Sequence, residues 1–262
     1  MPFTTVRGSA VHYATEGPPD IAPGPAVLFV HGAGGTHEQW RFQLRHLAPR
    51  WNALAVDLPG HGESQGDGYP TVPEYRDVVR DLLDALGLHR AVLVGHSMGG
   101  AIAQSLALAD PDRLAALVLV GTGARLRVHP DIFAVIRRGD MEEAGRLISG
   151  WSYAETALPA TVAQGAEAFA RNRPGVLERD FRACDAFDLL QEIAAIRAPT
   201  LVICGEEVRL TPVKYARFLH QQIPGAVLTI ITGAGHMVML EKPAEFTRAL
   251  KSFLEAHVHP VG

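Results

Sequence analysis

Cysteine is scarce in this chain, and so are other features that would narrow its class. Only Cys184 and Cys204 occur among 262 residues, too few and too far apart for a disulfide framework. Cys204 lies in an apolar run, so we expect a buried, unreactive thiol there. No apolar run approaches the ~20 residues that span a bilayer, and the first residues lack the apolar core of a signal peptide. These absences predict a soluble, cytoplasmic protein.

A strong excess of charge is also missing. The chain has 24 Lys and Arg against 28 Asp and Glu, a formal net charge of −4. Nucleic-acid binding needs a clustered basic face and membrane-surface binding needs an amphipathic basic segment, and neither is present. We therefore expect no nucleic acid and no membrane among its partners. With 47% hydrophobic and 20% charged residues, the chain has the composition of one large globular domain, or of one domain with an insertion.

Short aliphatic runs alternate with amphipathic segments along most of the sequence. Such runs are typical of strands buried on both faces of a parallel sheet covered by helices. A weaker alternation at 3–7 and 10–15 predicts an antiparallel edge hairpin. The strands are expected at 26–30, 52–57, 91–95, 114–120, 199–204 and 226–231, and the helices near 36–48, 72–86, 98–109, 212–221 and 243–256.

One region interrupts this alternation. Between about Arg125 and Ile196 no segment is typical of a strand, and short helical pieces are separated by Gly and Pro. We interpret it as an all-helical insertion; the alternative is a set of ordinary crossover helices. The predicted domains are therefore a core of residues 1–124 and 197–262 with a cap, or lid, of residues 125–196.

The sequence Gly-His-Ser-Met-Gly-Gly at 95–100 is the strongest chemical motif. It follows a predicted strand and precedes a predicted helix, which is the context of the nucleophile elbow G-x-S-x-G. Small flanking residues allow a tight turn in which Ser97 has a strained backbone. We therefore expect Ser97 to be a nucleophile at the carboxyl end of the strand.

A serine needs a general base, and His236 is the best placed of the twelve histidines. It lies in the loop after the last predicted strand, at the edge where open α/β sheets bind ligands. The alternative is that His236 has a structural role.

A glycine-rich loop, His31-Gly-Ala-Gly-Gly35, follows the first buried strand. Backbone N–H groups in this loop and after the nucleophile can form an oxyanion hole, and we favour those of Ala33 and Met98, with Gly34 next. The same glycines could cradle a phosphate, but neither nucleotide-binding pattern is complete. His31 itself is expected to make hydrogen bonds within the loop.

These motifs together resemble the α/β-hydrolase fold superfamily, in its serine esterase, monoacylglycerol-lipase-like or lactonase-like branch. The resemblance implies an eight-stranded, mostly parallel sheet with helices on both faces and a helical cap after strand six. It implies Ser97 as nucleophile, His236 as base and an architectural role for the turn around Asp57. The residues that carry it are HGAGG at 31–35, DLPGHGES at 57–64, GHSMGG at 95–100 and GAGHMVMLEKP at 233–243.

The catalytic acid of that family is missing from its usual position. The pattern G-x-x-D-x-x-x-P has Val208 where the family has Asp. Valine cannot accept the Nδ1 proton of the base, and loss of the triad carboxylate costs ~10⁴-fold in turnover in serine proteases. Either Glu206 or Glu207 substitutes for it, or the chain is an impaired or altered member; the turn after strand six offers no carboxylate.

The leading functional hypothesis is hydrolysis of small to medium apolar carboxylic esters through a Ser97 acyl-enzyme. The alternatives are carbon–carbon bond hydrolysis, lactone opening or perhydrolysis on the same fold, or a ligand receptor that does not turn over. The partner expected in each case is a small molecule, an ester or a lactone for the leading reaction. No cofactor is expected, and no metal site is apparent because histidines and carboxylates lack ligand spacing.

Overall fold

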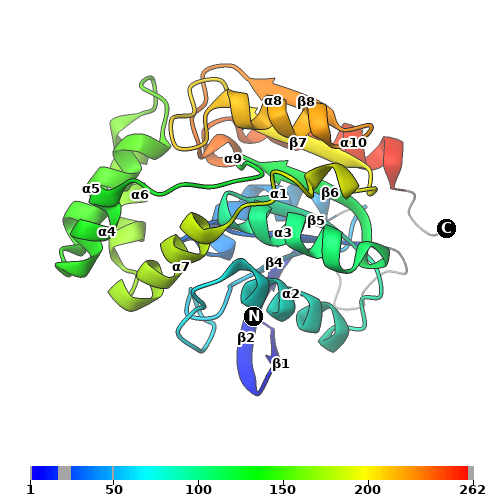
Figure 1. Ribbon diagram of the computed structural model, residues 1–262, viewed down its shortest axis with the longest axis horizontal. Helices are drawn as coiled ribbons and strands as arrows, with labels where there is room; N and C mark the ends of the chain where they lie inside the picture. Colours follow the sequence, from blue (N-terminus) through cyan, green and yellow to red (C-terminus); the bar gives the residue numbers. More distant parts are fainter. Residues whose placement is uncertain (1, 17–24, 49, 259–262) are drawn as a thin grey trace.

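The molecule is built around one twisted sheet. The computed structural model describes residues 2–16, 25–48 and 50–258. Eight strands lie in the order β1-β2-β4-β3-β5-β6-β7-β8 (Figure 1). The strands from β4 to β8 pair in parallel, and the hairpin of β1 and β2 adds an antiparallel edge. The predicted α/β fold is confirmed. The strands are β1 (Phe3–Val6), β2 (Ser9–Thr15), β3 (Ala26–Val30), β4 (Ala53–Val56), β5 (Ala91–His96), β6 (Leu114–Val120), β7 (Thr200–Gly205) and β8 (Val227–Ile231).

Helices cover both faces of the sheet (Figure 1). The buried side chains of α2, α3 and α8 belong to one hydrophobic cluster, and those of α1, α9 and α10 belong to the other. The expected helix at 36–48 begins with a 3-10 turn, and the short α9 was not expected. The helices of the two layers are η1 (His37–Trp40), α1 (Arg41–Leu47), α2 (Val72–Ala85), α3 (Met98–Ala109), α8 (Val213–Gln222), α9 (Val238–Glu241) and α10 (Pro243–His257).

Alternation along the buried strands sends neighbouring side chains to opposite helix layers. Leu28 and Val30 pack with α2 and α3, whereas Val27 and Phe29 pack on the α1 and α10 side. All five residues of β3 are fully buried, because both of its faces are covered. This explains why the sequence shows a continuous apolar run rather than a polar and apolar alternation.

Four helices follow β6 and precede β7, within the segment where the sequence predicts an insertion. They lie to one side of the sheet in Figure 1 and share a separate hydrophobic cluster that includes Ile132, Ile136 and Ile148. We call α4–α7 the helical insertion. Its members are α4 (Pro130–Arg137), α5 (Met141–Ser152), α6 (Pro159–Ala170) and α7 (Pro174–Ala186).

Both cysteines are buried and unpaired. Burial raises the pKa of the Cys204 thiol to about 11, which confirms the expected unreactive thiol in β7. Among the described helices, none is long and apolar enough to cross a membrane.

The tight junction of β5 and α3 predicts an unequal response of two glycines. A Cβ on Gly95 would clash with the carbonyl oxygen of Gly99 and lie 2.6 Å from the nitrogen of Gly100. Gly150 lies in α5 with open space around it. Gly95→Ala should therefore lower the free energy of unfolding by about 2 kcal/mol or more, whereas Gly150→Ala should raise it by about 0.5–1 kcal/mol. Urea unfolding followed by circular dichroism measures both, and equal midpoints for the two variants would contradict the packing described.

Candidate active site

Ser97 occupies a sharp turn between β5 and α3. Its backbone has φ 52° and ψ −114°, a conformation that non-glycine residues rarely adopt. Val120, the last residue of β6, and Thr122, just after it, hold Ser97 in this conformation. Ser97 N donates to Val120 O at 2.9 Å, and Thr122 Oγ1 donates to Ser97 O at 2.9 Å. The strained turn predicted from the sequence is therefore present, and it opens α3, whose positive dipole end lies beside the serine.

His236 lies in the loop between β8 and α9, next to this turn. The ring of His96, which directly precedes Ser97, is 4.5 Å from the ring of His236 by centroid, and its Nε2 donates to His236 O at 3.1 Å. The backbone N–H of His236 donates to Ser152 O of the insertion at 2.7 Å. Among the described residues, no hydrogen bond joins Ser97 Oγ to the His236 ring. The structure thus brings the expected nucleophile and base to the same edge of the sheet. The hydrogen bond between such a pair is often long or poorly aligned until substrate binds.

A hydroxyl group faces the inner nitrogen of His236. Thr211 Oγ1 lies 3.1 Å from His236 Nδ1 and 2.9 Å from Gly121 O. A carbonyl oxygen can only accept, so the single hydroxyl proton of Thr211 goes to Gly121 O. The remaining contact needs a proton from the ring, so Nδ1–H donates to Thr211 Oγ1. The Nε2 atom is then unprotonated, which is the state that a general base requires.

Burial makes His236 hard to charge. Its side chain is almost fully buried, at 5% exposure, and this burial lowers the pKa of His236 from its usual 6.5 to about 4. The ring is therefore neutral across the neutral and mildly acidic range.

No carboxylate of the described chain is hydrogen-bonded to the His236 ring. Val208 is buried in the main hydrophobic cluster, at 6% exposure. Glu206 is exposed, and Glu207 accepts a hydrogen bond from Glu155 N at 3.2 Å. The two glutamates expected as substitutes thus have other surroundings in this structure.

The sequence did not predict the contact between Thr211 and the His236 ring. Thr211 lies three positions after Val208, in the same loop after β7, directly before Pro212. The only feature of the sequence that could have indicated Thr211 is its position in the loop that carries the catalytic acid in the family. A second unforeseen residue, Glu241, accepts from Gly235 N at 2.9 Å and Ala154 N at 2.8 Å, and so ties the His236 loop to the insertion.

The glycine-rich loop after β3 is fixed from the side of the core. Leu58 N donates to His31 Nε2 at 3.0 Å, and His31 Nδ1 donates to Gly32 O at 2.7 Å. Gly35 N also donates to Gly32 O, at 3.0 Å. The expected loop-stabilising role of His31 is confirmed, and burial lowers its pKa to about 4, so the ring stays neutral.

The backbone N–H groups of Ala33 and Met98, near Ser97, have no hydrogen-bond acceptor among the described residues. Met98 opens α3, where the first N–H groups have no partner in the helix. Gly34 N, in contrast, donates to Asp180 Oδ2 at 3.0 Å. Of the two loop positions considered from the sequence, Ala33 therefore has the available N–H.

One group of described residues brings three potential metal ligands together: His12, His37 and Asp57. The sequence could not show it, because the three lie on separate segments. Each histidine Nδ1 is within 2.8 to 2.9 Å of Asp57 Oδ2, which is hydrogen-bonding distance. The same carboxylate accepts the backbone N–H groups of His37 at 2.7 Å and Glu63 at 3.1 Å. These contacts fit the architectural role expected for the Asp57 turn.

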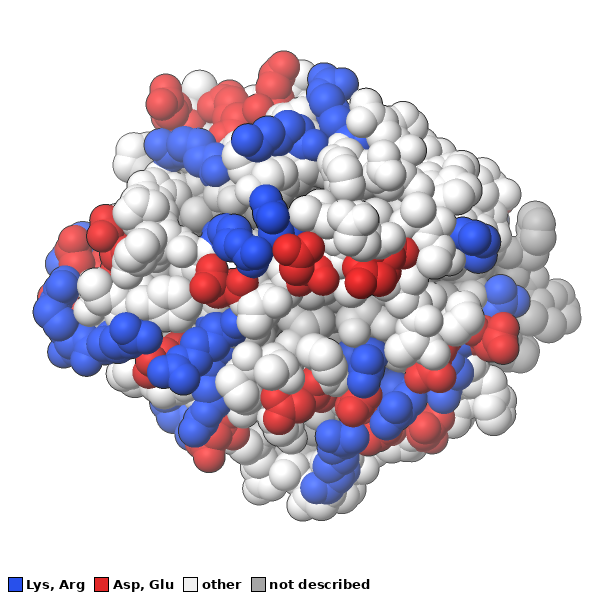
Figure 2. All heavy atoms as spheres, viewed as in Figure 1, with Lys and Arg blue, Asp and Glu red and all other residues white. Residues whose placement is uncertain are grey.

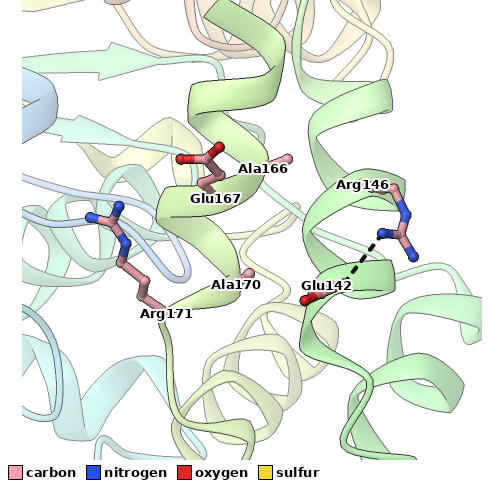
Figure 3. Close-up of a pocket in the computed structure, with 6 residues that line it drawn as sticks. All are labelled: Glu142, Arg146, Ala166, Glu167, Ala170 and Arg171. Carbon is pink, nitrogen blue, oxygen red and sulfur yellow. Dashed lines mark ion pairs between the residues drawn. The ribbon is translucent and has the colours of Figure 1, made fainter.

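Neither the charge distribution on the viewed face nor a surface pocket on the helical insertion marks the Ser97 region. Figure 2 shows Lys and Arg interspersed with Asp and Glu over the viewed face. A pocket of about 360 Å³ lies along α5 and α6, where Glu142 and Arg146 form an ion pair at 3.8 Å (Figure 3). None of its lining residues belongs to the Ser97 and His236 region: they are Glu142, Arg146, Ala166, Glu167, Ala170 and Arg171.

Several hydrolases are similar to this chain in sequence or in fold. A thermophilic esterase of known structure is 39% identical, with a TM-score of 0.86 over 98% of both chains. The enol-lactonase from Burkholderia xenovorans LB400 is 27% identical, with a TM-score of 0.90 over 97% of this chain and all of that one, 100%. The 2-hydroxy-6-oxo-6-phenylhexa-2,4-dienoate hydrolase of Comamonas testosteroni is 28% identical over 93% of this chain and 91% of its own. The sequence profile of the alpha/beta hydrolase family matches residues 27–249. The chain therefore belongs to the alpha/beta hydrolase family.

Proposed function

We propose that this hydrolase cleaves small to medium apolar carboxylic esters, with Ser97 as nucleophile and His236 as general base. The observation that carries the proposal is the backbone conformation of Ser97. A φ of 52° at a serine between a buried strand and a helix costs free energy, and such strained residues cluster at active sites. The 39% identity to a thermophilic esterase supports the ester as substrate class.

The proposed reaction begins with attack of Ser97 Oγ on the ester carbonyl carbon. The hydroxyl proton passes to His236 Nε2, and the carbonyl electron pair becomes an oxyanion held by the N–H groups of Ala33 and Met98. Collapse of this intermediate breaks the bond to the alcohol oxygen, which takes the proton from Nε2. Water then attacks the acyl-enzyme by the same route and releases the acid.

Thr211 fills part of the role of the missing acid in this proposal. Its hydroxyl oxygen keeps the proton on Nδ1 of His236, so the base has the correct tautomer. It carries no charge, however, and a neutral acceptor stabilises the imidazolium less than a carboxylate does. We therefore expect turnover below that of relatives with a complete triad.

The helical insertion supports an apolar substrate. We propose that residues 125–196 form a cap over a core of residues 1–124 and 197–262. Phe169 and Leu177 of the insertion pack so close to the loop that a Cβ on Gly34 would lie 2.6 and 2.7 Å from them. Apolar side chains beside the proposed oxyanion hole favour an apolar acyl or alcohol group.

A second candidate reaction is lactone opening, which uses the same residues on a cyclic ester. The similarity to the enol-lactonase, with its TM-score of 0.90, supports this reaction. A panel of matched open-chain esters and lactones would rank the two by kcat/KM.

Ester hydrolysis tests the proposal itself. With short-chain p-nitrophenyl esters, Ser97→Ala should lower kcat by ~10³-fold or more, because the nucleophile is lost. Val208→Asp should raise kcat by ~10-fold or more by returning a carboxylate to the family's acid position, whereas Val208→Asn should not. Turnover that survives Ser97→Ala, or no turnover alongside tight ligand binding, would reject the esterase proposal.

A matched pair of threonine variants tests the tautomer argument. Thr211→Val keeps the shape but removes the acceptor of the Nδ1 proton, so kcat should fall ~10- to 100-fold with little change in KM. Thr211→Ser keeps the hydroxyl and should retain most of the activity. Ring ¹⁵N chemical shifts of His236 would report the proton position directly. Equal rates for the valine and serine variants would rule out a role for the hydroxyl.

The pH dependence follows from burial of His236. Because its pKa is lowered to about 4, the base stays neutral well below pH 6.5, and the acid limb of kcat/KM should lie near pH 4. Val208→Asp should stabilise the imidazolium, raise the pKa of His236 and move that limb to higher pH. Rates measured alongside melting temperatures separate this titration from unfolding. A wild-type limb near the usual 6.5 would contradict the proposal.

A further inference from the structure

The helical insertion holds both sides of one residue in the glycine-rich loop. Asn172 Nδ2, between α6 and α7, donates to Gly34 O at 2.9 Å. Asp180 Oδ2, on α7, accepts from Gly34 N at 3.0 Å. Phe169 and Leu177 pack against the same glycine. The polar and apolar contacts of Gly34 therefore come from the insertion, although the loop belongs to the core.

Asp180 is anchored in turn by the core. It is fully buried, at 0% exposure, and accepts from Tyr75 OH at 2.5 Å and from His61 Nε2 at 2.7 Å. Burial disfavours a charge on His61, yet the carboxylate of Asp180 raises its pKa above the usual range. The other ring nitrogen, Nδ1, lies 3.2 Å from Pro59 O, which can only accept. Both nitrogens of His61 therefore carry protons, and a buried ion pair joins the insertion to the core.

The loop is thus held from two sides. The core fixes Gly32 through His31, and the insertion fixes Gly34 through Asn172 and Asp180. Ala33 lies between these two fixed residues. Its N–H belongs to the peptide group that carries Gly32 O, and the next peptide group carries Gly34 N, which Asp180 binds. A rotation of either group moves this N–H, and a donor displaced by ~1 Å can cost ~10²-fold in rate.

We infer that Asn172 and Asp180 are positioning residues that aim the Ala33 N–H, so that seating of the helical insertion on the core completes the oxyanion hole. Neither residue touches the reacting atoms; they act through Gly34. This inference rests on the proposed function, in which Ala33 stabilises the oxyanion.

Another contact between insertion and core provides a control. Arg173, next to Asn172, pairs with Asp67 at 2.8 Å on the surface, and its guanidinium also donates to Gly66 O and Gly60 O. It makes no hydrogen bond to Gly34 among the described residues. If the insertion only needed to be attached, loss of this ion pair would matter as much as loss of Asn172. If Gly34 is the point of action, Arg173→Ala should leave kcat within about twofold, as exposed ion pairs contribute little.

The test compares Asn172→Ala, Asp180→Ala, Asp180→Asn and Arg173→Ala in the whole protein. We expect kcat for a p-nitrophenyl ester to fall ~10- to 100-fold in the two single truncations, with KM nearly unchanged. A trifluoromethyl ketone, which forms an oxyanionic adduct with the serine, should bind more weakly by a similar factor. Asp180→Asn should recover part of the loss, because its amide oxygen can still accept from Gly34 N. Asn172→Ala keeps the test valid if Asp180→Ala does not fold.

Amide hydrogen exchange gives a readout that does not depend on activity. Asn172 bonds no amide of the loop, so faster exchange at Gly34 and Gly35 in Asn172→Ala would report release of the loop itself. Unchanged exchange there would overturn the inference, and so would faster exchange with unchanged kcat. Absence of esterase turnover in the wild type would instead reject the proposed function, and the exchange comparison would still decide whether the insertion holds the loop.

Discussion

The backbone of Ser97 is the constraint on which the arrangement depends. A serine with φ 52° persists only where its surroundings determine it. Here β5 lies in the interior of the sheet between β3 and β6. The last residue of β6, Val120, binds the amide of Ser97, and Thr122, just after β6, binds its carbonyl group. Gly99 is pressed so closely against the end of β3 that a Cβ would lie 2.7 Å from His31 O. The same packing that strains the serine brings the glycine-rich loop beside it.

In the proposed mechanism, His236 is a base that is oriented without a neighbouring carboxylate. Two separate requirements are combined in a usual triad acid: it fixes the tautomer, and it stabilises the charge that develops on the ring. In this molecule Thr211 satisfies the first through a hydroxyl whose own proton is committed to Gly121 O. No carboxylate among the described residues meets the second at the His236 ring, and burial opposes the charge. In the proposed mechanism, this division of roles gives a base available at low pH but a less favourable transition state.

Much of the fold was predictable because buried parallel strands have a strong sequence signal. The run at 26–30 matches β3, and the motif at 95–100 placed the end of β5, and with it Ser97, to within one residue. Local patterns could not show contacts between distant segments. Thr211 and His236 are 25 positions apart, and Gly34 and Asp180 are 146 apart. The short helix α9 was missed because four residues hold too little periodicity to detect.

The proposed mechanism requires that His236, whose Nδ1 proton is held by Thr211, activates Ser97. Reaction with an alkyl p-nitrophenyl phosphonate, followed by mass spectrometry of the modified peptide, tests it most directly. We expect a single adduct on Ser97, formed far more slowly in His236→Ala, more slowly in Thr211→Val and near the wild-type rate in Thr211→Ser. A folded protein that forms no adduct, or that labels equally fast without His236, would contradict it.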